Sequence, residues 1–209
     1  MLSAIVTNTI TDACLTIFLL YVFIASLAQH LLGNKKFTRH IVLFFFTVLV
    51  IGLFATLAHY LTNKGDPELL HHVWLAISAA VVYLNYSVIY SIKTPDAVKM
   101  MVMFISLLCL YFFNITMQFV FIALSMVFIY FFAAVYSQKL TRIGFLAIVI
   151  SNVLWIVVRK GINYELGYAL PVQYRYDNDV YHVLIMFSVY LIYKSIKEGD
   201  WSYPSSNNG

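Results

Sequence analysis

Apolar runs of about twenty residues recur along this chain of 209 residues. A helix needs roughly 20 such residues to cross the hydrocarbon core of a bilayer, which is about 30 Å thick. Hydrophobic residues make up 62% of the chain and charged residues 11%. Soluble domains carry about 45–50% and about 25%, respectively. A water-soluble core cannot absorb this excess, so the chain is predicted to be an integral, multi-pass membrane protein.

Seven of these runs are candidate transmembrane helices, and the fourth is the shortest. They cover residues 9–32, 41–62, 69–92, 97–113, 116–137, 141–159 and 179–197. Helices satisfy their own backbone hydrogen bonds in lipid, and the runs lack the alternation of barrel strands. The predicted fold is therefore an all-α bundle of seven transmembrane helices over residues 1–198. A polar tail over residues 199–209 follows, and we expect disorder from Trp201 onward.

The placement of lysine and arginine predicts the orientation of the bundle. If the N-terminus is outside, nine of these residues fall on inner segments and four on outer ones. Cytoplasmic segments carry the excess of positive charge, so we predict an outer N-terminus and a cytoplasmic C-terminus. The nine inner residues are Lys35, Lys36, Arg39, Lys93, Lys99, Lys139, Arg142, Lys194 and Lys197.

Six ionisable residues lie at similar depth near the outer ends of the predicted helices. They are Asp12, His59, His71, His72, Asp179 and His182. Ionisable side chains are costly inside a membrane and mark functional sites by default. Their shared depth predicts a polar site beneath the outer face of the bundle.

Helix periodicity indicates which of these residues face inward. Gly52 and Thr56 share an i, i+4, i+7 face with His59, and small residues mark close helix packing. On the next helix, His71 repeats with Ser78 and Asn85 at seven-residue intervals. This polar stripe favours His71 over His72 as the inward histidine.

Histidine nitrogens and carboxylate oxygens are ligands that zinc takes in tetrahedral sites, and a catalytic site leaves one position for water. The sequence therefore predicts a zinc site built from His59, from His71 or His72, and from His182. Asp179 is predicted to be a fourth ligand or the base that acts on the metal-bound water. Asp12, the second candidate catalytic carboxylate, is predicted to orient a ligand histidine.

Each of these residues also has an ordinary structural interpretation. A histidine near the membrane surface is often only solvated or hydrogen-bonded. Asp12 and Asp179 could cap the first and seventh helices, because carboxylates are favourable near helix N-termini. Asn178 is a competing cap for the seventh helix, and His71-His72 could cap or line a loop.

The layout resembles the CREST superfamily, which includes alkaline ceramidases and progestin/adiponectin receptors. Its usual signature is Ser-x3-His in helix two, Asp in helix three and His-x3-His in helix seven. His59 matches the helix-two histidine, and His182 matches the second histidine of helix seven. Thr11-Asp12, His59 and residues 178–183 are also similar to a bacterial membrane family with the same layout.

This sequence departs from the CREST signature at three positions. Ala55 replaces the helix-two serine, with Thr56 as the neighbouring hydroxyl, and Asn178 replaces the first histidine of helix seven. Histidine stands at 71–72, where the helix-three aspartate is expected. These substitutions either preserve a zinc site with its ligands on different helices or indicate that the site was lost or repurposed.

Three functions follow as hypotheses. The leading one is a zinc-dependent hydrolase of a lipid amide or ester, with the tyrosine-rich segment 160–178 as a lid over the outer mouth. The alternatives are a non-catalytic receptor or scaffold for a lipid or small molecule, and a transporter. Membrane lipids and a lipid-like substrate or ligand are the expected partners. No basic patch on a soluble face suggests nucleic-acid binding.

Overall fold

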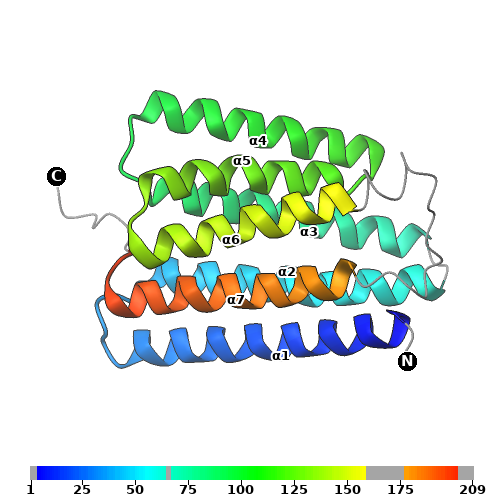
Figure 1. Ribbon diagram of the computed structural model, residues 1–209, viewed down its shortest axis with the longest axis horizontal. Coiled ribbons are helices and arrows are strands. Elements are labelled where there is room, and N and C mark those ends of the chain that lie inside the picture. The colour runs from blue at the N-terminus through cyan, green and yellow to red at the C-terminus, as the bar shows by residue number, and fades with distance from the viewer. Residues whose placement is uncertain (1–3, 65–66, 159–176, 202–209) are drawn as a thin grey trace.

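The computed structural model of the chain describes residues 4–64, 67–158 and 177–201. Within these residues the chain forms seven α-helices and no strand (Figure 1). The helices are α1 (Ala4–Leu31), α2 (Arg39–Lys64), α3 (Pro67–Tyr90), α4 (Asp96–Thr116), α5 (Val120–Tyr136), α6 (Lys139–Ile156) and α7 (Asp177–Glu198). The prediction of an all-α chain with seven helices is confirmed, and most helix ends fall within a few residues of those predicted.

Six of the helices are long and apolar enough to cross a membrane, and α5 is the shorter one with 17 residues. The prediction that the fourth helix is the shortest is wrong, because α4 has 21 residues. The helix continues past Asn114, and the Thr116 hydroxyl donates to the Phe112 carbonyl at 2.8 Å. Polar residues in the last turn therefore extend α4, which ends at Met117 in the left-handed conformation with φ 54°.

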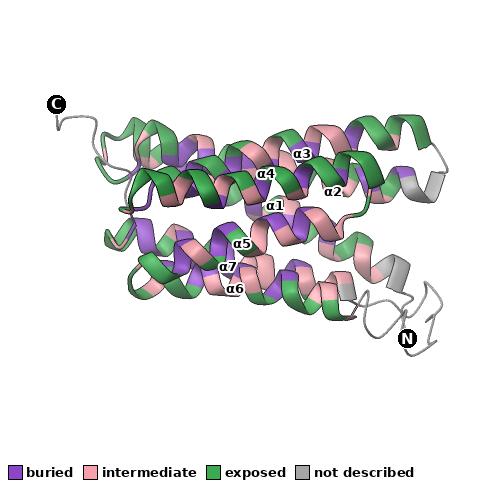
Figure 2. Ribbon diagram, turned by 90° about the horizontal axis from the view of Figure 1, so that it is seen from above, coloured by how far each residue is buried: buried purple, intermediate pink, exposed green. Residues whose placement is uncertain are grey.

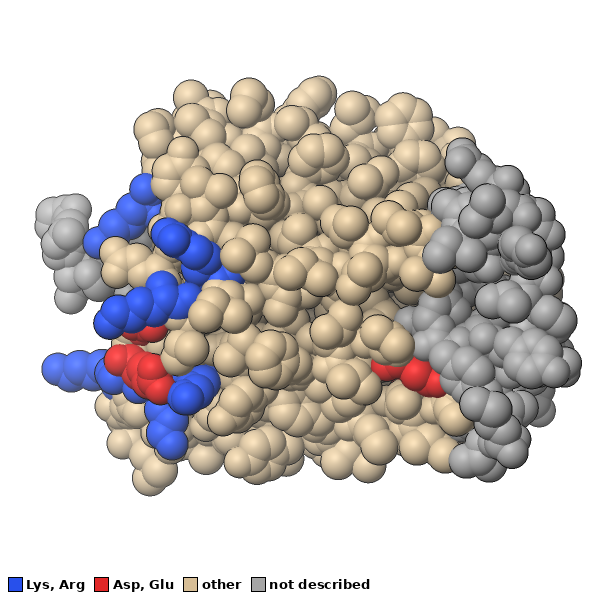
Figure 3. All heavy atoms as spheres, viewed as in Figure 1, with Lys and Arg blue, Asp and Glu red and all other residues tan. Residues whose placement is uncertain are grey.

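The helices run alternately up and down along the long axis of the molecule (Figure 1). In the described part of the chain, α1 packs against α2 and α7, whereas α3 packs against α2, α4 and α5. The beginning of α1, the end of α2 and the beginning of α7 share one end of the bundle, called here the site end. The opposite end is called the basic end, because the nine lysines and arginines predicted to be inner all lie there (Figure 3).

Exposed residues lie along the outward sides of the helices between the two ends (Figure 2), and many of them are large and apolar. Ile17 and Met100 are each 68% exposed, and Phe104 is 67% exposed. Contiguous apolar surface of this kind is rare on soluble monomers. It suits contact with lipid, which agrees with the apolar character of the candidate spans.

Close packing of α1 against α2 positions the polar residues of the site end. A Cβ on Gly52 would lie 2.6 Å from Leu19 Cδ1, so glycine at this position leaves room for the Leu19 side chain between the two helices. One turn later Thr56 Oγ1 lies 3.2 Å from Thr16 Oγ1. The predicted inward orientation of the Gly52–His59 face is therefore confirmed, with α1 as the neighbour that it meets.

The chain after α7 turns back onto the basic end. Gly199, with φ 92°, ends the helix, as glycine commonly does. Trp201 is 5% exposed, packs edge-on against Phe44 and Phe145, and donates from Nε1 to Ser91 Oγ at 2.9 Å. The prediction that disorder begins at Trp201 is wrong for this residue, because burying the indole ring offsets the cost of ordering it. Residues 202–209 lie outside the described part.

Candidate metal centre

Asp12 lies on the inner side of α1, eight residues after the helix begins at Ala4. Only 4% of the residue is exposed. It is too far along the helix to act as an N-terminal cap, because capping is confined to the first turn. A buried carboxylate needs hydrogen-bonding or charged partners, and α2 and α7 provide them.

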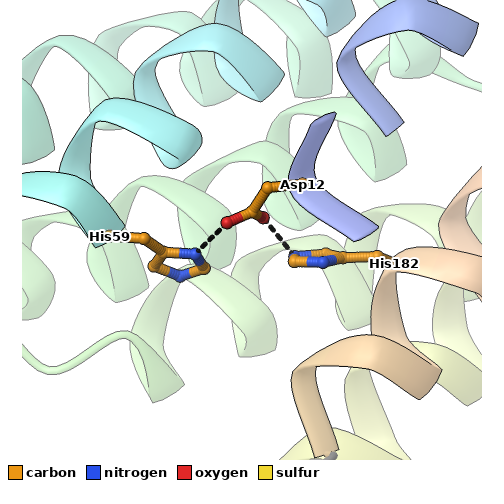
Figure 4. A group of neighbouring side chains, drawn as sticks. All are labelled: Asp12, His59 and His182. Atoms are coloured by element: carbon orange, nitrogen blue, oxygen red, sulfur yellow. Dashed lines mark hydrogen bonds and ion pairs between the residues drawn. The ribbon is translucent and has the colours of Figure 1, made fainter. Parts of the chain in front are cut away.

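The Asp12 carboxylate lies between two histidine rings from different helices (Figure 4). Its Oδ2 is 2.8 Å from Nδ1 of His59 on α2, and its Oδ1 is 3.3 Å from Nε2 of His182 on α7. The two ring centroids are 6.0 Å apart. His182 is almost fully buried, whereas the His59 side chain is 34% exposed.

Asp12, His59 and His182 could hold a metal ion, since one ligand atom from each lies within 4.8 Å of the others. Tetrahedral zinc, with bonds of about 2.0–2.1 Å, separates its ligand atoms by about 3.3 Å. The two nitrogen–oxygen distances, each to a different oxygen of Asp12, lie near or below that value. The three ligand atoms, one from each residue, lie within 4.8 Å of one another, so coordination would require them to draw closer by up to about 1.5 Å.

Asp179 reaches the same site through Thr11. The Thr11 hydroxyl donates to Asp179 Oδ1 at 2.7 Å and lies 3.3 Å from His182 Nδ1. Asp179 is the third residue of α7, so its charge also lies at the favourable N-terminal end of that helix. Asp12 is thus in direct contact with both histidines, whereas Asp179 is linked to His182 through the Thr11 hydroxyl.

His71 and His72 lie together near the start of α3, with ring centroids 6.0 Å apart. Both are exposed, so the prediction that His71 turns inward is wrong. The stripe holds deeper in the helix, where Ser78 and Asn85 are buried. The physical reason is topological, since α2 stands between α3 and the α1–α7 pair. Neither histidine belongs to the group formed by Asp12, His59 and His182, and a metal-binding role for them stays a prediction.

Asn178, which occupies the position of the first CREST histidine of helix seven, has a structural partner. Its Oδ1 accepts a hydrogen bond from Trp155 Nε1 of α6 at 3.1 Å. Asn178 therefore links α6 to α7 at the site end. The predicted lid over 160–178 falls almost entirely within residues 159–176, which lie outside the described part of the chain.

Thr11 is the site residue that sequence reasoning did not assign a role. The available signal was a hydroxyl directly before the aspartate, but Thr7, Thr9 and Thr16 are further hydroxyls in the same part of α1, so the signal did not single out Thr11. Periodicity could not reveal it, because its partner Asp179 lies 168 residues away in the sequence.

Comparison with known proteins gives one match. A family model described as a family of unknown function (DUF6962) matches residues 7–200 of the chain. Searches of curated proteins and of solved structures found no match. The matched range includes Thr11, Asp12, His59, Asp179 and His182, so the candidate centre lies inside it. The chain belongs to this family, DUF6962.

Proposed function

We propose that the protein is a zinc-dependent membrane hydrolase that acts on a lipid amide or ester. The observation that supports the proposal is the convergence of Asp12, His59 and His182 from three helices, with ligand atoms within 4.8 Å of one another. Two imidazoles and a carboxylate are a ligand set of catalytic zinc sites, which keep a further position for water or substrate. The resemblance to the CREST superfamily favours the same reaction class, with α1 supplying the carboxylate in place of helix three.

The depth of the centre suits a bond near the lipid headgroup. In the proposed orientation the site end faces outward and the basic end faces the cytoplasm, as the excess of lysine and arginine favours. Asp12 lies eight residues from the start of α1, and His59 and His182 lie five from the nearer end of their helices. At 1.5 Å per residue these steps correspond to about 12 Å and about 8 Å. Amide and ester linkages of membrane lipids lie at this boundary between headgroup and hydrocarbon.

The three residues have different parts in the proposed reaction. His59, His182 and Asp12 hold the ion, which when bound polarises a carbonyl and lowers the pKa of a coordinated water to about 7. His182 and Asp12 are buried and fix the geometry from within the bundle. His59 is the most exposed of the three, so its side of the centre is the one open to an approaching substrate.

Metal analysis of the purified full-length protein tests the proposal. We expect about one zinc per chain in the unmodified protein and loss of zinc in His59→Ala, His182→Ala and Asp12→Ala. His72→Ala is the matched control, since this exposed histidine lies outside the group. Hydrolysis of an acylated amine and of a phospholipid ester then separates the two substrate classes. Absence of zinc from the unmodified protein, or zinc that survives His59→Ala and His182→Ala, would overturn the proposal.

One distance favours a second candidate, a metal-free receptor for a lipid or small molecule. The 2.8 Å separation of His59 Nδ1 and Asp12 Oδ2 is an ordinary N–H···O hydrogen bond. In a receptor the two groups would form a polar pair that binds the ligand. Asp179→Asn would then change ligand affinity or stability in a protein that shows no turnover and no bound metal.

A further inference from the structure

The Thr11 hydroxyl has three neighbours and a single proton to share among them. Its Oγ1 lies 2.7 Å from Asp179 Oδ1, 3.1 Å from the Asn8 carbonyl oxygen and 3.3 Å from His182 Nδ1. An ionised carboxylate and a carbonyl are acceptors only. Only the histidine nitrogen can be either donor or acceptor. The position of the hydroxyl proton therefore determines whether His182 Nδ1 carries a hydrogen.

The shortest contact assigns the proton to Asp179. Hydrogen bonds from a hydroxyl to a carboxylate are short, at about 2.5–2.7 Å, and stronger than bonds to a neutral acceptor. If the proton pointed at His182 instead, two oxygens would lie 2.7 Å apart with no proton between them. The hydroxyl therefore offers only lone pairs to His182 Nδ1, and that contact is favourable only when the nitrogen carries hydrogen.

We infer that Thr11, held by Asp179, fixes His182 with its proton on Nδ1, so that Nε2 is presented to a cation shared with Asp12. Nε2 lies 3.3 Å from Asp12 Oδ1. A nitrogen lone pair and a carboxylate oxygen repel each other at this distance, and in the metal-free protein the Thr11 contact must outweigh that repulsion. A metal ion between them would remove the repulsion and would bind the neutral ring through the free nitrogen.

Thr11 and Asp179 are therefore positioning residues. Histidines that bind metals usually donate their second N–H to a carboxylate, carbonyl or water, which fixes the ring orientation. Here a hydroxyl lies between the histidine and the carboxylate. The arrangement gives Asp179 a role that differs from the predicted one of ligand or base, and it explains why a threonine precedes the buried aspartate of α1.

Metal affinity is the first test, and this part of the inference rests on the proposed function. Thr11→Val keeps the shape of the side chain and removes the hydroxyl, and Thr11→Ser keeps the hydroxyl. We expect Thr11→Val to weaken zinc binding about 10–100-fold, as loss of such partners typically does, and Thr11→Ser to restore most of the affinity. Thr16→Val is the control on the same helix, since its hydroxyl contacts Thr56 and not the centre. Unchanged affinity in Thr11→Val, or equal losses in the valine and serine variants, would refute the role of the hydroxyl.

The protonation of the His182 ring is a second test that needs no metal. In metal-free full-length protein with ¹⁵N-labelled histidine, we expect the His182 Nδ1 resonance to be that of a protonated nitrogen. Thr11→Val should shift the proton toward Nε2, and Thr16→Val should not. If the unmodified protein binds no zinc, the proposed hydrolase fails, but this measurement still decides on the positioning role. An unprotonated Nδ1 in the unmodified protein would overturn the inference.

Discussion

Asp12 Oδ2 lies 2.8 Å from His59 Nδ1 and joins α1 to α2 across 47 residues of sequence. The other oxygen of the same carboxylate lies 3.3 Å from His182 Nε2 on α7. One side chain therefore connects three helices at the site end. The Asp12 side chain is only 5% exposed, so this connection lies in the interior of the bundle.

Replacing Asp12 by alanine should destabilise the protein strongly. His59 Nδ1 loses its acceptor, and breaking a buried charged contact from one side typically costs about 3–5 kcal/mol. We expect the free energy of unfolding in detergent to fall by about 3 kcal/mol, because the partial exposure of His59 lets that ring regain some hydration. Asp96→Ala is the control, since this carboxylate is 91% exposed and pairs with Lys99 at 3.5 Å. Equal stability of the two variants would contradict the central position of Asp12.

His59 and His182 should differ in their effects on stability although both contact Asp12. The His182 side chain is 6% exposed and the His59 side chain 34%. Truncating a buried side chain leaves a cavity and unpaired polar neighbours, whereas a partly exposed site is filled by solvent or lipid. His182→Ala should therefore lower the unfolding temperature clearly more than His59→Ala. If the proposed centre forms, both variants lose zinc to the same extent. Equal losses of stability in the two variants would contradict the expected effect of their different burial.

The depth of Asp12, His59 and His182 was predictable from sequence because helix direction alternates along a chain of short connections. Alternation places the start of α1, the end of α2 and the starts of α3 and α7 at one end. It does not determine which helices adjoin. That choice depends on side-chain packing, such as the approach of Gly52 to Leu19. The sequence therefore predicted the correct end of the bundle for His71 but the wrong neighbouring helices.

That Asp12, and not Asp179, contacts both histidines could not be foreseen for a related reason. Both carboxylates lie near the start of a helix, so sequence position alone ranks them equally. What separates them is rotation about the helix axis and the hydroxyl of Thr11, which reaches Asp179 at 2.7 Å. A hydrogen bond between residues so distant in sequence leaves no periodic signal in a single chain.

A buried hydrogen-bonded cluster should hold α4 against the bundle. Asn85 Nδ2 of α3 donates to Ser106 Oγ of α4 at 2.9 Å and to Ser125 Oγ of α5 at 2.7 Å, and the two hydroxyls are 2.7 Å apart. Interhelical hydrogen bonds in membranes contribute about 0.6 kcal/mol on average and at most about 1.7. Asn85→Val, which loses two such bonds, should cost about 1 kcal/mol or more.

The serine variants of this cluster provide the comparison. Ser106→Ala should cost about as much as Asn85→Val, because it also removes two of the three contacts and leaves only the bond from Asn85 to Ser125. In a double-mutant cycle the two substitutions should be non-additive, since they share one hydrogen bond. Additive losses in unfolding free energy would show that Asn85 and Ser106 act independently.

Alanine at Gly144 should be more costly than alanine at Gly52, although both glycines lie in tight helix contacts. A Cβ at position 52 would meet only Leu19 Cδ1, at 2.6 Å, which is the end of a flexible side chain that can turn away. A Cβ at position 144 would lie 2.9 Å from Ile192 Cγ1 and 3.3 Å from the Ile192 backbone nitrogen. The backbone of α7 cannot move aside without separating α7 from α6. Overpacking of this kind costs about 1–3 kcal/mol, so Gly144→Ala should lower the unfolding temperature more than Gly52→Ala.

The same substitution should also disturb the candidate centre from a distance. Displacing α7 moves His182 relative to Asp12, and a metal site tolerates little error in the position of its ligands. Zinc affinity should therefore fall in Gly144→Ala, even though position 144 lies near the basic end of α6, far from the site end. Ala133→Gly is a useful comparison, because it loosens the buried face of α5 and adds no atom against α7. A Gly144→Ala protein with unchanged stability would contradict the close α6–α7 contact. Lowered stability with unchanged zinc affinity would show that this contact does not position His182.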